Sequence, residues 1–328
     1  MLNSRESHIE NVISTAESSK AAALSRLAAS WTRSMAIHGL HPGERRAPER
    51  VDQANLRERQ QREERFTDIA APYLDHLFGL VGQPGCCVLL SDAQGVILDQ
   101  RINTADSDQF REWGLWKGTD WSEKAEGTNG IGTCLVEAKQ TVIHLEQHFY
   151  ARNTGMSCID APIFGPDGSL IGALDVSSAR HDHTENLNVL VRALVQQIAR
   201  QIEADSFRTA YAKARILDVL GASGGGAAFL AIDQDDVVVG ATRNARHKYQ
   251  LGGGGIIMPQ LVSEILDTDD RPQVSFEKAE RTTIVQALTQ HNRNVSEAAR
   301  ALEIGRATMY RRMTKLAIDP KADDLSIH

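Results

Sequence analysis

The feature that most restricts the fold of this chain is a series of short, β-branched segments between residues 86 and 177, with helical patterns on both sides. Turn-forming tetrapeptides, Asp-Ala-Gln-Gly and Gly-Pro-Asp-Gly, separate two pairs of these segments. Short strands joined by such turns pair as neighbours in an antiparallel sheet. Helices before and after the sheet indicate an α+β domain. The expected strands cover residues 86–92, 95–100, 140–145, 158–164 and 169–177.

Helical patterns are expected on both sides of this sheet. After Glu185 one apolar stripe recurs at steps of three and four, formed by Leu187, Val191, Leu194, Ile198 and Ile202. Such a helix could close the domain, pair with its copy in a dimer, or do both. Residues 1–65 are also expected to be helical, and their densest charged run, 54–66, is interpreted as a solvated helix.

The whole chain is expected to form several domains, because 328 residues exceed one ordinary compact domain. Residues 224–251 have the pattern of two strands and a helix, and the glycines at 252–255 are interpreted as a flexible joint. The predicted divisions are an N-terminal helical segment at 1–65, the domain with the expected sheet at 66–205, a linker at 206–269 and a helical domain at 270–328.

Composition and charge restrict where the chain works. No run approaches the roughly eighteen apolar residues of a membrane span. The polar N-terminus lacks the apolar core of a signal peptide, and four cysteines do not form a disulfide framework. These features predict a cytoplasmic protein. The net charge of −7 argues against a nucleic-acid partner until its distribution is considered, because residues 276–318 contain eight basic and four acidic residues.

Three helical segments are expected in this basic region, at 276–290, from Asn294, and from 305 to 316. Asn294 can cap the second helix, and Glu297 can complete a capping box. At 100° per residue, Met309, Met313 and Leu316 share the buried face of the third helix. The opposite face carries small and basic side chains suited to a DNA groove, and its flank carries cations suited to phosphates. These are Arg306, Ala307, Thr308, Arg311, Arg312 and Lys315.

Residues 280–318 resemble the Fis-type helix-turn-helix at the end of bacterial enhancer-binding proteins. The resemblance implies that Asn294 and Ser296 contact the DNA backbone, while Arg306, Thr308 and Arg311 face the groove. It also implies that the first helix forms a dimer interface and that the operator has two-fold symmetry. Two positions depart from the family: Glu303 stands where a glycine is usual, and Gly305 where a serine or asparagine is usual.

The segments 121–150 and 158–179 resemble the GAF domain of the acetoin-catabolism regulator family. The glycine-rich Glu-Gly-Thr-Asn-Gly-Ile-Gly-Thr either brings backbone amides close to a small ligand or forms tight turns. Two aromatic residues are expected to wall a pocket, and several polar residues to point into it. The predicted ligand-binding residues are Trp121, Glu126, Asn129, His148, Phe149, Cys158, Asp160 and Asp175.

Two histidine groups, His144 with His148 and His181 with His183, contain side chains that can bind metal, but no metal and no cofactor is predicted. The four cysteines, Cys86, Cys87, Cys134 and Cys158, are interpreted as buried small hydrophobic residues, since a redox sensor needs an exposed thiolate.

Relatives of this kind usually carry an ATPase between sensor and DNA-binding domain, but this sequence has no Gly-Lys dipeptide and no GAFTGA segment. Residues 206–275 are too few for such a domain, and 229–251 resemble only a remnant of a PAS-like segment.

The sequence therefore predicts a homodimeric, non-enzymatic transcription regulator that binds double-stranded DNA and senses a small-molecule or metabolic signal. It would act by occupancy, recruiting or blocking RNA polymerase or modulating an ATPase-bearing relative. Two alternatives stay open at this point. One is a thiol redox enzyme or sensor similar to the GAF-type methionine sulfoxide reductases. The other is a modulator that forms mixed dimers with an ATPase-bearing relative.

Overall fold

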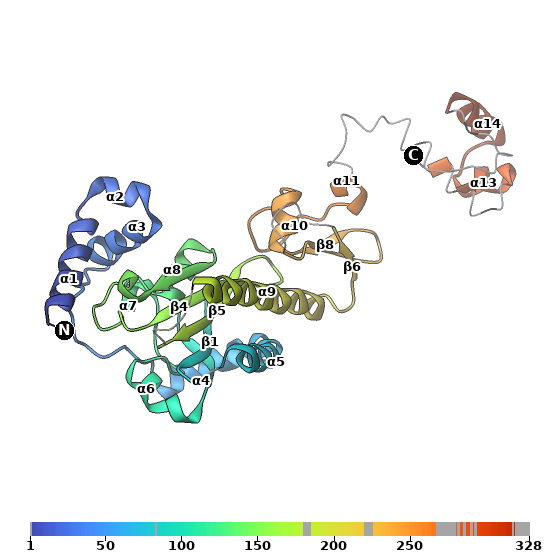
Figure 1. Cartoon of the computed structure of the whole chain (residues 1–328). Coiled ribbons are helices and arrows are strands. Elements are labelled where there is room, and N and C mark those ends of the chain that lie inside the picture. Colours follow the sequence, from blue (N-terminus) through green and yellow to red (C-terminus); the bar gives the residue numbers. More distant parts are fainter. Residues whose placement is uncertain are drawn as a thin grey trace. The chain divides into compact units, whose positions relative to one another are not determined.

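The computed structural model of the chain describes residues 2–82, 84–179, 185–219, 226–266, 280, 283–284, 287–288, 291, 294–316 and 318. The chain divides into two compact units, Met1–Leu261 and Val262–His328, each with its own core (Figure 1). Of the helices in the described ranges, none has the length and apolar character needed to cross a bilayer.

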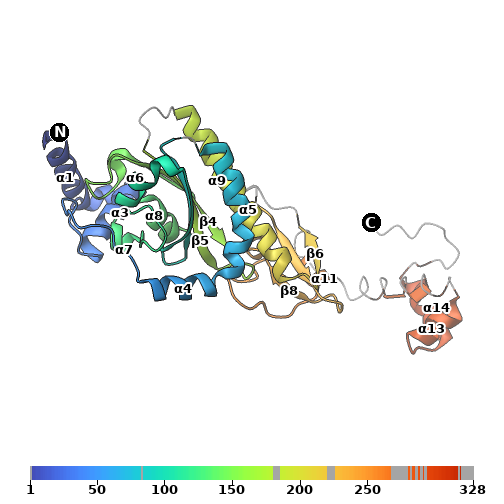
Figure 2. The same cartoon turned by 90° about the horizontal axis from the view of Figure 1, so that it is seen from below.

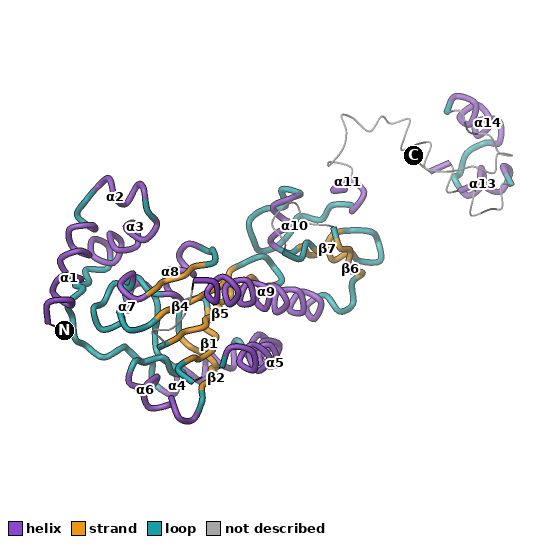
Figure 3. Tube along the Cα trace, in the orientation of Figure 1, coloured by secondary structure: helices purple, strands orange, loops and turns teal. Residues whose placement is uncertain are grey.

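The first unit contains most of the regular structure (Figure 3). Its strands are β1 (Cys86–Asp92), β2 (Ile97–Ile102), β3 (Thr141–His144), β4 (Ser157–Phe164), β5 (Leu170–Ser178), β6 (Arg215–Asp218), β7 (Phe229–Ile232) and β8 (Val238–Ala241). Its helices include α1 (Leu2–Ala16), α2 (Ser19–Leu24), α3 (Arg26–Thr32), α4 (Gln53–Arg62), α5 (Glu64–Val81), α6 (Ser107–Glu112), α7 (Glu123–Glu126), α8 (Gly130–Glu137), α9 (Glu185–Ala210) and α10 (Arg243–Lys248).

The main sheet has the order β2-β1-β5-β4-β3, and every neighbouring pair is antiparallel. This confirms the predicted α+β class with an antiparallel sheet. The second strand begins at Ile97 rather than residue 95. Gly95 has a φ of +93° and belongs to the turn, while Val96 pairs with Asp120 outside the main ladder.

One face of this sheet is aliphatic and packs against α5 and α9, which lie side by side (Figure 2). On α9, Val191, Ile198 and Ile202 are buried and Leu194 is partly buried, as the stripe predicts. The side chain of Leu187 lies outside the described residues. Alternate residues of each strand supply this face, since side chains alternate across a sheet. They include Val88, Leu90, Ile159, Ala161, Leu174 and Val176.

The opposite face of the sheet is partly polar and is covered by α8. The N-terminal helices pack beside this layer, where the Trp31 indole donates a hydrogen bond to the Gln147 carbonyl at 3.0 Å. Arg33 forms an ion pair with Glu123 of α7 at 2.8 Å. The charged run 54–66 is divided, because α4 ends at Arg62 and α5 begins at Glu64. No residue of α4 is buried, so the solvated helix is confirmed for 54–62, whereas Phe66 of α5 is buried in the core.

Residues 226–261 are folded rather than an open linker. The two expected strands and helix are present as β7, β8 and α10, and β6 adds a third strand that the sequence pattern did not indicate. The segment interpreted as a flexible joint, 252–255, meets the turn between β4 and β5 through Gly254 and Gly255. The amide of Gly255 donates to the Asp167 carbonyl at 3.0 Å, and Arg246 donates to the Gly255 carbonyl.

The second unit contains α11 (Val262–Leu266), α13 (Val295–Ala301) and α14 (Arg306–Lys315). Met309, Met313 and Leu316 of α14 are buried against Ala298 and Ala299 of α13, which confirms the predicted buried face. Ile284 and Leu288, from the expected first helix, join the same core, and both are helical. Phe276 and Ala279 lie outside the described residues.

The turn between α13 and α14 has two departures from an ideal connection. Asn294 caps α13 by accepting hydrogen bonds from the amides of Ser296 and Glu297. The predicted capping box is not completed, because the Asn294 amide donates to the His291 carbonyl instead. Gly305 precedes α14 without a side-chain cap. Glu303 has a φ of +54°, a left-handed conformation that costs L-residues roughly 1–2 kcal/mol.

Glu303→Gly is therefore expected to stabilise the second unit by about 1 kcal/mol or less, since glycine adopts this conformation without steric strain but loses more entropy on folding. Glu297→Gly within α13 is the matched control and is expected to destabilise by about 1 kcal/mol. Native-state hydrogen exchange of the α13 and α14 amides measures both changes. Equal destabilisation by the two substitutions would contradict the strain at Glu303.

Candidate functional site: a buried carboxyl pair and an exposed basic helix

The polar face of the main sheet carries two rungs of functional side chains. In the first rung Ser177 of β5 lies opposite Cys87 of β1 and Cys158 of β4. In the second, Asp175 of β5 lies opposite Asp160 of β4. Residues directly opposite each other on antiparallel strands point to the same face. Two carboxyl groups therefore lie side by side in the interior of the domain, and both are buried.

The carboxyl pair is poorly satisfied by its surroundings. Ser177 Oγ donates to Asp175 Oδ2 at 2.7 Å. Both oxygens of Asp160 and Oδ1 of Asp175 accept no hydrogen bond from any other described residue. Burial raises the pKa of Asp160 well above its usual range, and the carboxyl of Asp175 raises it further. Burial also raises the pKa of Asp175, against the opposing hydrogen bond from Ser177.

A neutral histidine and a thiol extend the first rung. His148 Nε2 lies 3.4 Å from Cys158 Sγ, and His148 Nδ1 lies 2.9 Å from the Leu145 carbonyl oxygen. Burial lowers the pKa of His148 to about 4, so the imidazole is uncharged near neutral pH. The ring cannot supply a positive charge to compensate the nearby carboxyl pair.

The first turn of α8 closes over Asp160. Asn129 caps this helix by accepting a hydrogen bond from the Gly132 amide at 2.8 Å. A Cβ atom at residue 130 would collide with Oδ2 of Asp160 and Cβ of Cys158. Gly130 is thus required for close approach of the helix to the carboxyl group. The glycine-rich segment thus provides close packing at Gly130 and a turn at Gly127, which has a φ of +61°.

The structure brings together Asn129, His148, Cys158, Asp160 and Asp175 from the predicted ligand set. The other three predicted residues are engaged elsewhere.

Trp121 lies in the core beside α6, where its indole donates to the Gly114 carbonyl at 2.8 Å. Phe149 packs with Trp31 from the N-terminal helices. Glu126 forms an ion pair with Arg152 at 2.6 Å and accepts a hydrogen bond from Asn153. Ser177 was missed, although its position two residues after Asp175 on a strand places it on the same face.

The cysteines of this face are buried and protonated. Burial raises the pKa of Cys87, Cys134 and Cys158 well above the usual thiol value, and Asp175 raises each further. A nucleophilic or redox-active cysteine needs an accessible thiolate, which this environment disfavours. Among the described residues, no group of three or more His, Cys, Asp or Glu side chains is arranged to hold a metal ion. His181 and His183 lie outside the described residues.

The second unit presents a basic surface on α14. Arg306, Ala307, Arg311, Arg312 and Lys315 are exposed, while Thr308 is partly buried. Arg312 Nη1 lies 2.8 Å from Glu280 Oε1, so this arginine is paired with a residue of the expected helix at 276–290. At the start of α13, Asn294 is exposed and Ser296 partly exposed. All eight residues predicted to contact DNA therefore belong to one helix pair.

Comparison with known proteins finds a matching family model in each of the two units. A GAF-domain model matches residues 65–204, and a model of the Fis family of bacterial regulatory proteins matches residues 275–316. The acetoin catabolism regulatory protein of Cupriavidus necator is 33% identical over 247 residues. This chain is a homologue of the acetoin-catabolism regulators. It carries a GAF domain and a Fis-type helix-turn-helix.

The similarity covers unequal shares of the two proteins. The alignment with the Cupriavidus necator protein includes 73% of this chain but only 37% of that relative. An acetoin dehydrogenase operon transcriptional activator of Bacillus subtilis is 27% identical over 55% of this chain and 30% of its own length. The chain thus spans about a third of these relatives.

A solved complex of Escherichia coli DhaR(N) with DhaL gives a TM-score of 0.50 at 15% identity, over 73% of this chain and 80% of that one. That likeness concerns the fold alone.

Asp160→Asn is expected to make the first unit more stable than the parent chain at neutral and alkaline pH, by at least about 1 kcal/mol. The raised pKa of Asp160 means that the folded state binds its proton more tightly than the unfolded state does. That contribution is complete below the unfolded carboxyl pKa and is lost as pH rises, so the advantage of asparagine should grow with pH.

Denaturant unfolding followed by tryptophan fluorescence measures this difference, since all four tryptophans lie in the first unit. Asp99→Asn is the control of opposite sign. Burial acts to raise the pKa of Asp99, but hydrogen bonds from Lys117 and Arg101 prevail and lower it. Asp99→Asn should therefore destabilise at neutral pH, with the loss disappearing in acid. A pH-independent effect of Asp160→Asn would refute the buried ionisable pair.

Proposed function

We propose that this protein is a sequence-specific, DNA-binding transcription regulator whose GAF domain senses a small molecule. The exposed face of α14 carries this proposal, because it presents arginine and small side chains while Met309 and Met313 fix the helix from behind. A helix-turn-helix inserts such a helix into the major groove. The two relatives of this chain described above are an acetoin catabolism regulatory protein and an acetoin dehydrogenase operon transcriptional activator. We propose that this protein acts in the cytoplasm, where bacterial DNA lies.

The assignment of DNA contacts follows from the helix geometry. Arg306, Thr308 and Arg311 are proposed to contact base edges, with Ala307 allowing close approach. Asn294, Ser296 and Lys315 are proposed to contact phosphates. Arg312 would contribute to the phosphate surface while remaining paired with Glu280. Two copies joined through the helix that contains Ile284 and Leu288 would bind a two-fold operator.

The sensory site is proposed to be the carboxyl pair. The three oxygens of Asp160 and Asp175 that lack other partners can accept hydrogen bonds from a ligand's hydroxyl or amine groups. The first turn of α8 would have to move to admit it, since Gly130 lies against Asp160. Acetoin, in the names of two relatives, is a hydroxyketone. A small hydroxylated molecule is therefore the proposed effector class.

The mode of action is proposed to be occupancy of DNA. The 70 residues from 205 to 274 separate the two matched domains, and they include the folded β6–β8 segment. The sequence contains no Gly-Lys dipeptide with which to build a phosphate-binding loop. Regulation would then consist of recruiting or blocking RNA polymerase, or of forming mixed dimers with an ATPase-bearing relative. Mass measurement of the chain alone and mixed with such a relative distinguishes the last mode.

Selection of genomic DNA fragments by the purified full chain tests the proposal as a whole. Enrichment of a two-fold sequence, absent for a chain ending at residue 270, is the expected result. The salt dependence of binding then separates sequence-specific from purely electrostatic association. Binding without sequence preference would remove the proposed function.

Arg311→Ala is expected to weaken binding to the selected operator by about 1–3 kcal/mol and to affect random DNA much less, because a base contact carries sequence information. Arg215→Ala is the matched control, since it removes the same charge from an exposed arginine of the first unit. Fluorescence anisotropy at fixed salt measures all three proteins. If Arg311→Ala weakens operator and random DNA equally, Arg311 contacts phosphate rather than a base.

A further inference from the structure

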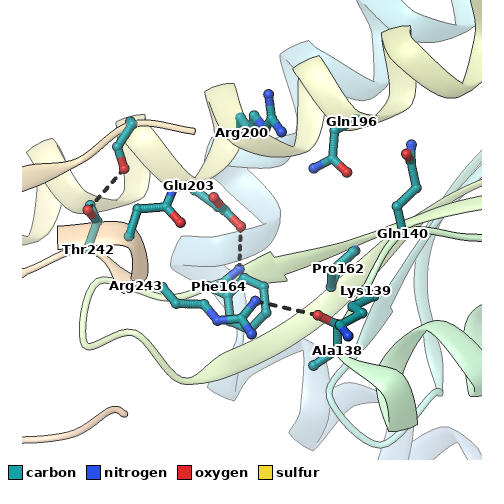
Figure 4. A pocket seen from close by; sticks show the side chains of 12 residues that line it. Ala138, Lys139, Gln140, Pro162, Phe164, Gln196, Arg200, Glu203, Thr242 and Arg243 are labelled. Carbon is teal, nitrogen blue, oxygen red and sulfur yellow. Dashed lines mark hydrogen bonds between the residues drawn. The ribbon is translucent and has the colours of Figure 1, made fainter. Parts of the chain in front are cut away.

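A polar cleft lies on the outer side of the GAF domain, where α9 and β4 meet α10. Its volume is about 230 Å³. Figure 4 shows Gln196, Arg200 and Glu203 along α9, with Phe164 and Arg243 on the other side. Neither Asp160 nor Asp175 lines this cleft, because that pair lies on the α8 side of the sheet.

The side chains around this cleft carry a positive excess. Lys139, Arg200 and Arg243 are cationic, and Glu203 is the single acid among the twelve lining residues. Glu203 accepts a hydrogen bond from the Phe164 amide at 2.9 Å, which fixes it at the cleft wall. Burial raises the pKa of Glu203 to about 7, although the Phe164 hydrogen bond and the charges of Arg243 and Arg200 act to lower it. Near neutral pH the acid therefore offsets less than one of three positive charges.

Arg243 is held in a fixed position within the cleft. Its guanidinium carbon lies 3.9 Å from the centroid of the Phe164 ring. Its Nη1 donates to the Ala138 carbonyl at 3.4 Å (Figure 4). Stacking on an aromatic ring orients the plane of a guanidinium and leaves its edge available for hydrogen bonds. Within the described part of the chain, the other nitrogens of Arg243 have no hydrogen-bond partner.

We propose that this cleft binds a small carboxylate, with Arg243 as the principal ligand and Arg200 and Lys139 supplying further positive charge. A carboxylate matches the planar fork of a guanidinium and replaces the negative charge that Glu203 only partly provides. The amides of Gln196 and Asn244 are placed to fix the rest of such a molecule. A volume of about 230 Å³ suits a few carbon atoms.

The position of the cleft gives the binding a structural consequence. Phe164 ends β4 of the GAF domain, and Arg243 begins α10 of the β6–β8 segment. A ligand held by Arg243 of α10 and Arg200 of α9 would join the β6–β8 segment to the GAF domain. The inference does not depend on DNA binding or on the carboxyl-pair effector.

Isothermal titration of the full chain with acetate, pyruvate and succinate, and separately with inorganic phosphate, tests the proposal. Saturable binding of at least one carboxylate in preference to phosphate is expected. Arg243→Gln should weaken that binding about tenfold or more, because it removes a charge-assisted hydrogen bond. Glu203→Gln should strengthen it several-fold, since glutamine can still accept from the Phe164 amide but carries no negative charge.

Arg62→Gln, a change of the same charge on α4 at a residue that does not line the cleft, is the control and should bind as the parent chain does. Tryptophan fluorescence verifies that each variant is folded, and Arg200→Gln replaces Arg243→Gln if the latter unfolds. The proposal is overturned if no carboxylate binds saturably, or if phosphate binds equally well. It is also overturned if the substitutions in the cleft leave the affinity unchanged.

Discussion

Burial of two carboxyl groups on adjacent central strands is the constraint on which the sensory domain depends. The aliphatic face of the sheet packs against α5 and α9 and supplies the apolar burial. The opposite face must accommodate Asp160 and Asp175 without a cation at hand, since His148 is uncharged. Buried carboxyls in this situation hold protons that they would release in water. Small side chains around the pair, above all Gly130, let α8 cover it closely.

The same strand pair links the interior to the segment that precedes the DNA-binding unit. From Asp160 and Asp175 the strands run to the turn at 165–168, where Asp167 accepts a hydrogen bond from the Gly255 amide. Arg246 packs against Gly168 and donates to the Gly255 carbonyl. Glycines at these positions allow the two backbones to approach. A change in β4 and β5 that accompanies effector binding would reach residues 252–255 through direct contacts rather than through a free linker.

The local features of this fold could be predicted from sequence, and its register could not. The stripe of Met309, Met313 and Leu316 lies within three turns of one helix, so its periodicity alone identifies the buried face. Counting outward from the Phe164–Leu170 pair would place Asp160 opposite residue 174. A bulge shifts the pairing by one, so Asp160 faces Asp175 instead. Trp121 and Phe149 were grouped because both are aromatic, whereas tertiary packing assigned them to separate clusters.

A regulator that acts by occupancy depends on how effector binding changes its affinity for DNA. An effector can alter that affinity only if it binds two arrangements of the protein unequally. The carboxyl pair covered by α8 and the same pair opened to a ligand would be two such arrangements. A ligand that forms the proposed hydrogen bonds with Asp160 and Asp175 would favour an arrangement in which α8 is displaced from the close contact at Gly130. No ATP hydrolysis enters this scheme, so the coupling free energy between effector binding and DNA binding is reciprocal. Operator DNA should therefore change the affinity for effector by the same factor as effector changes the affinity for DNA.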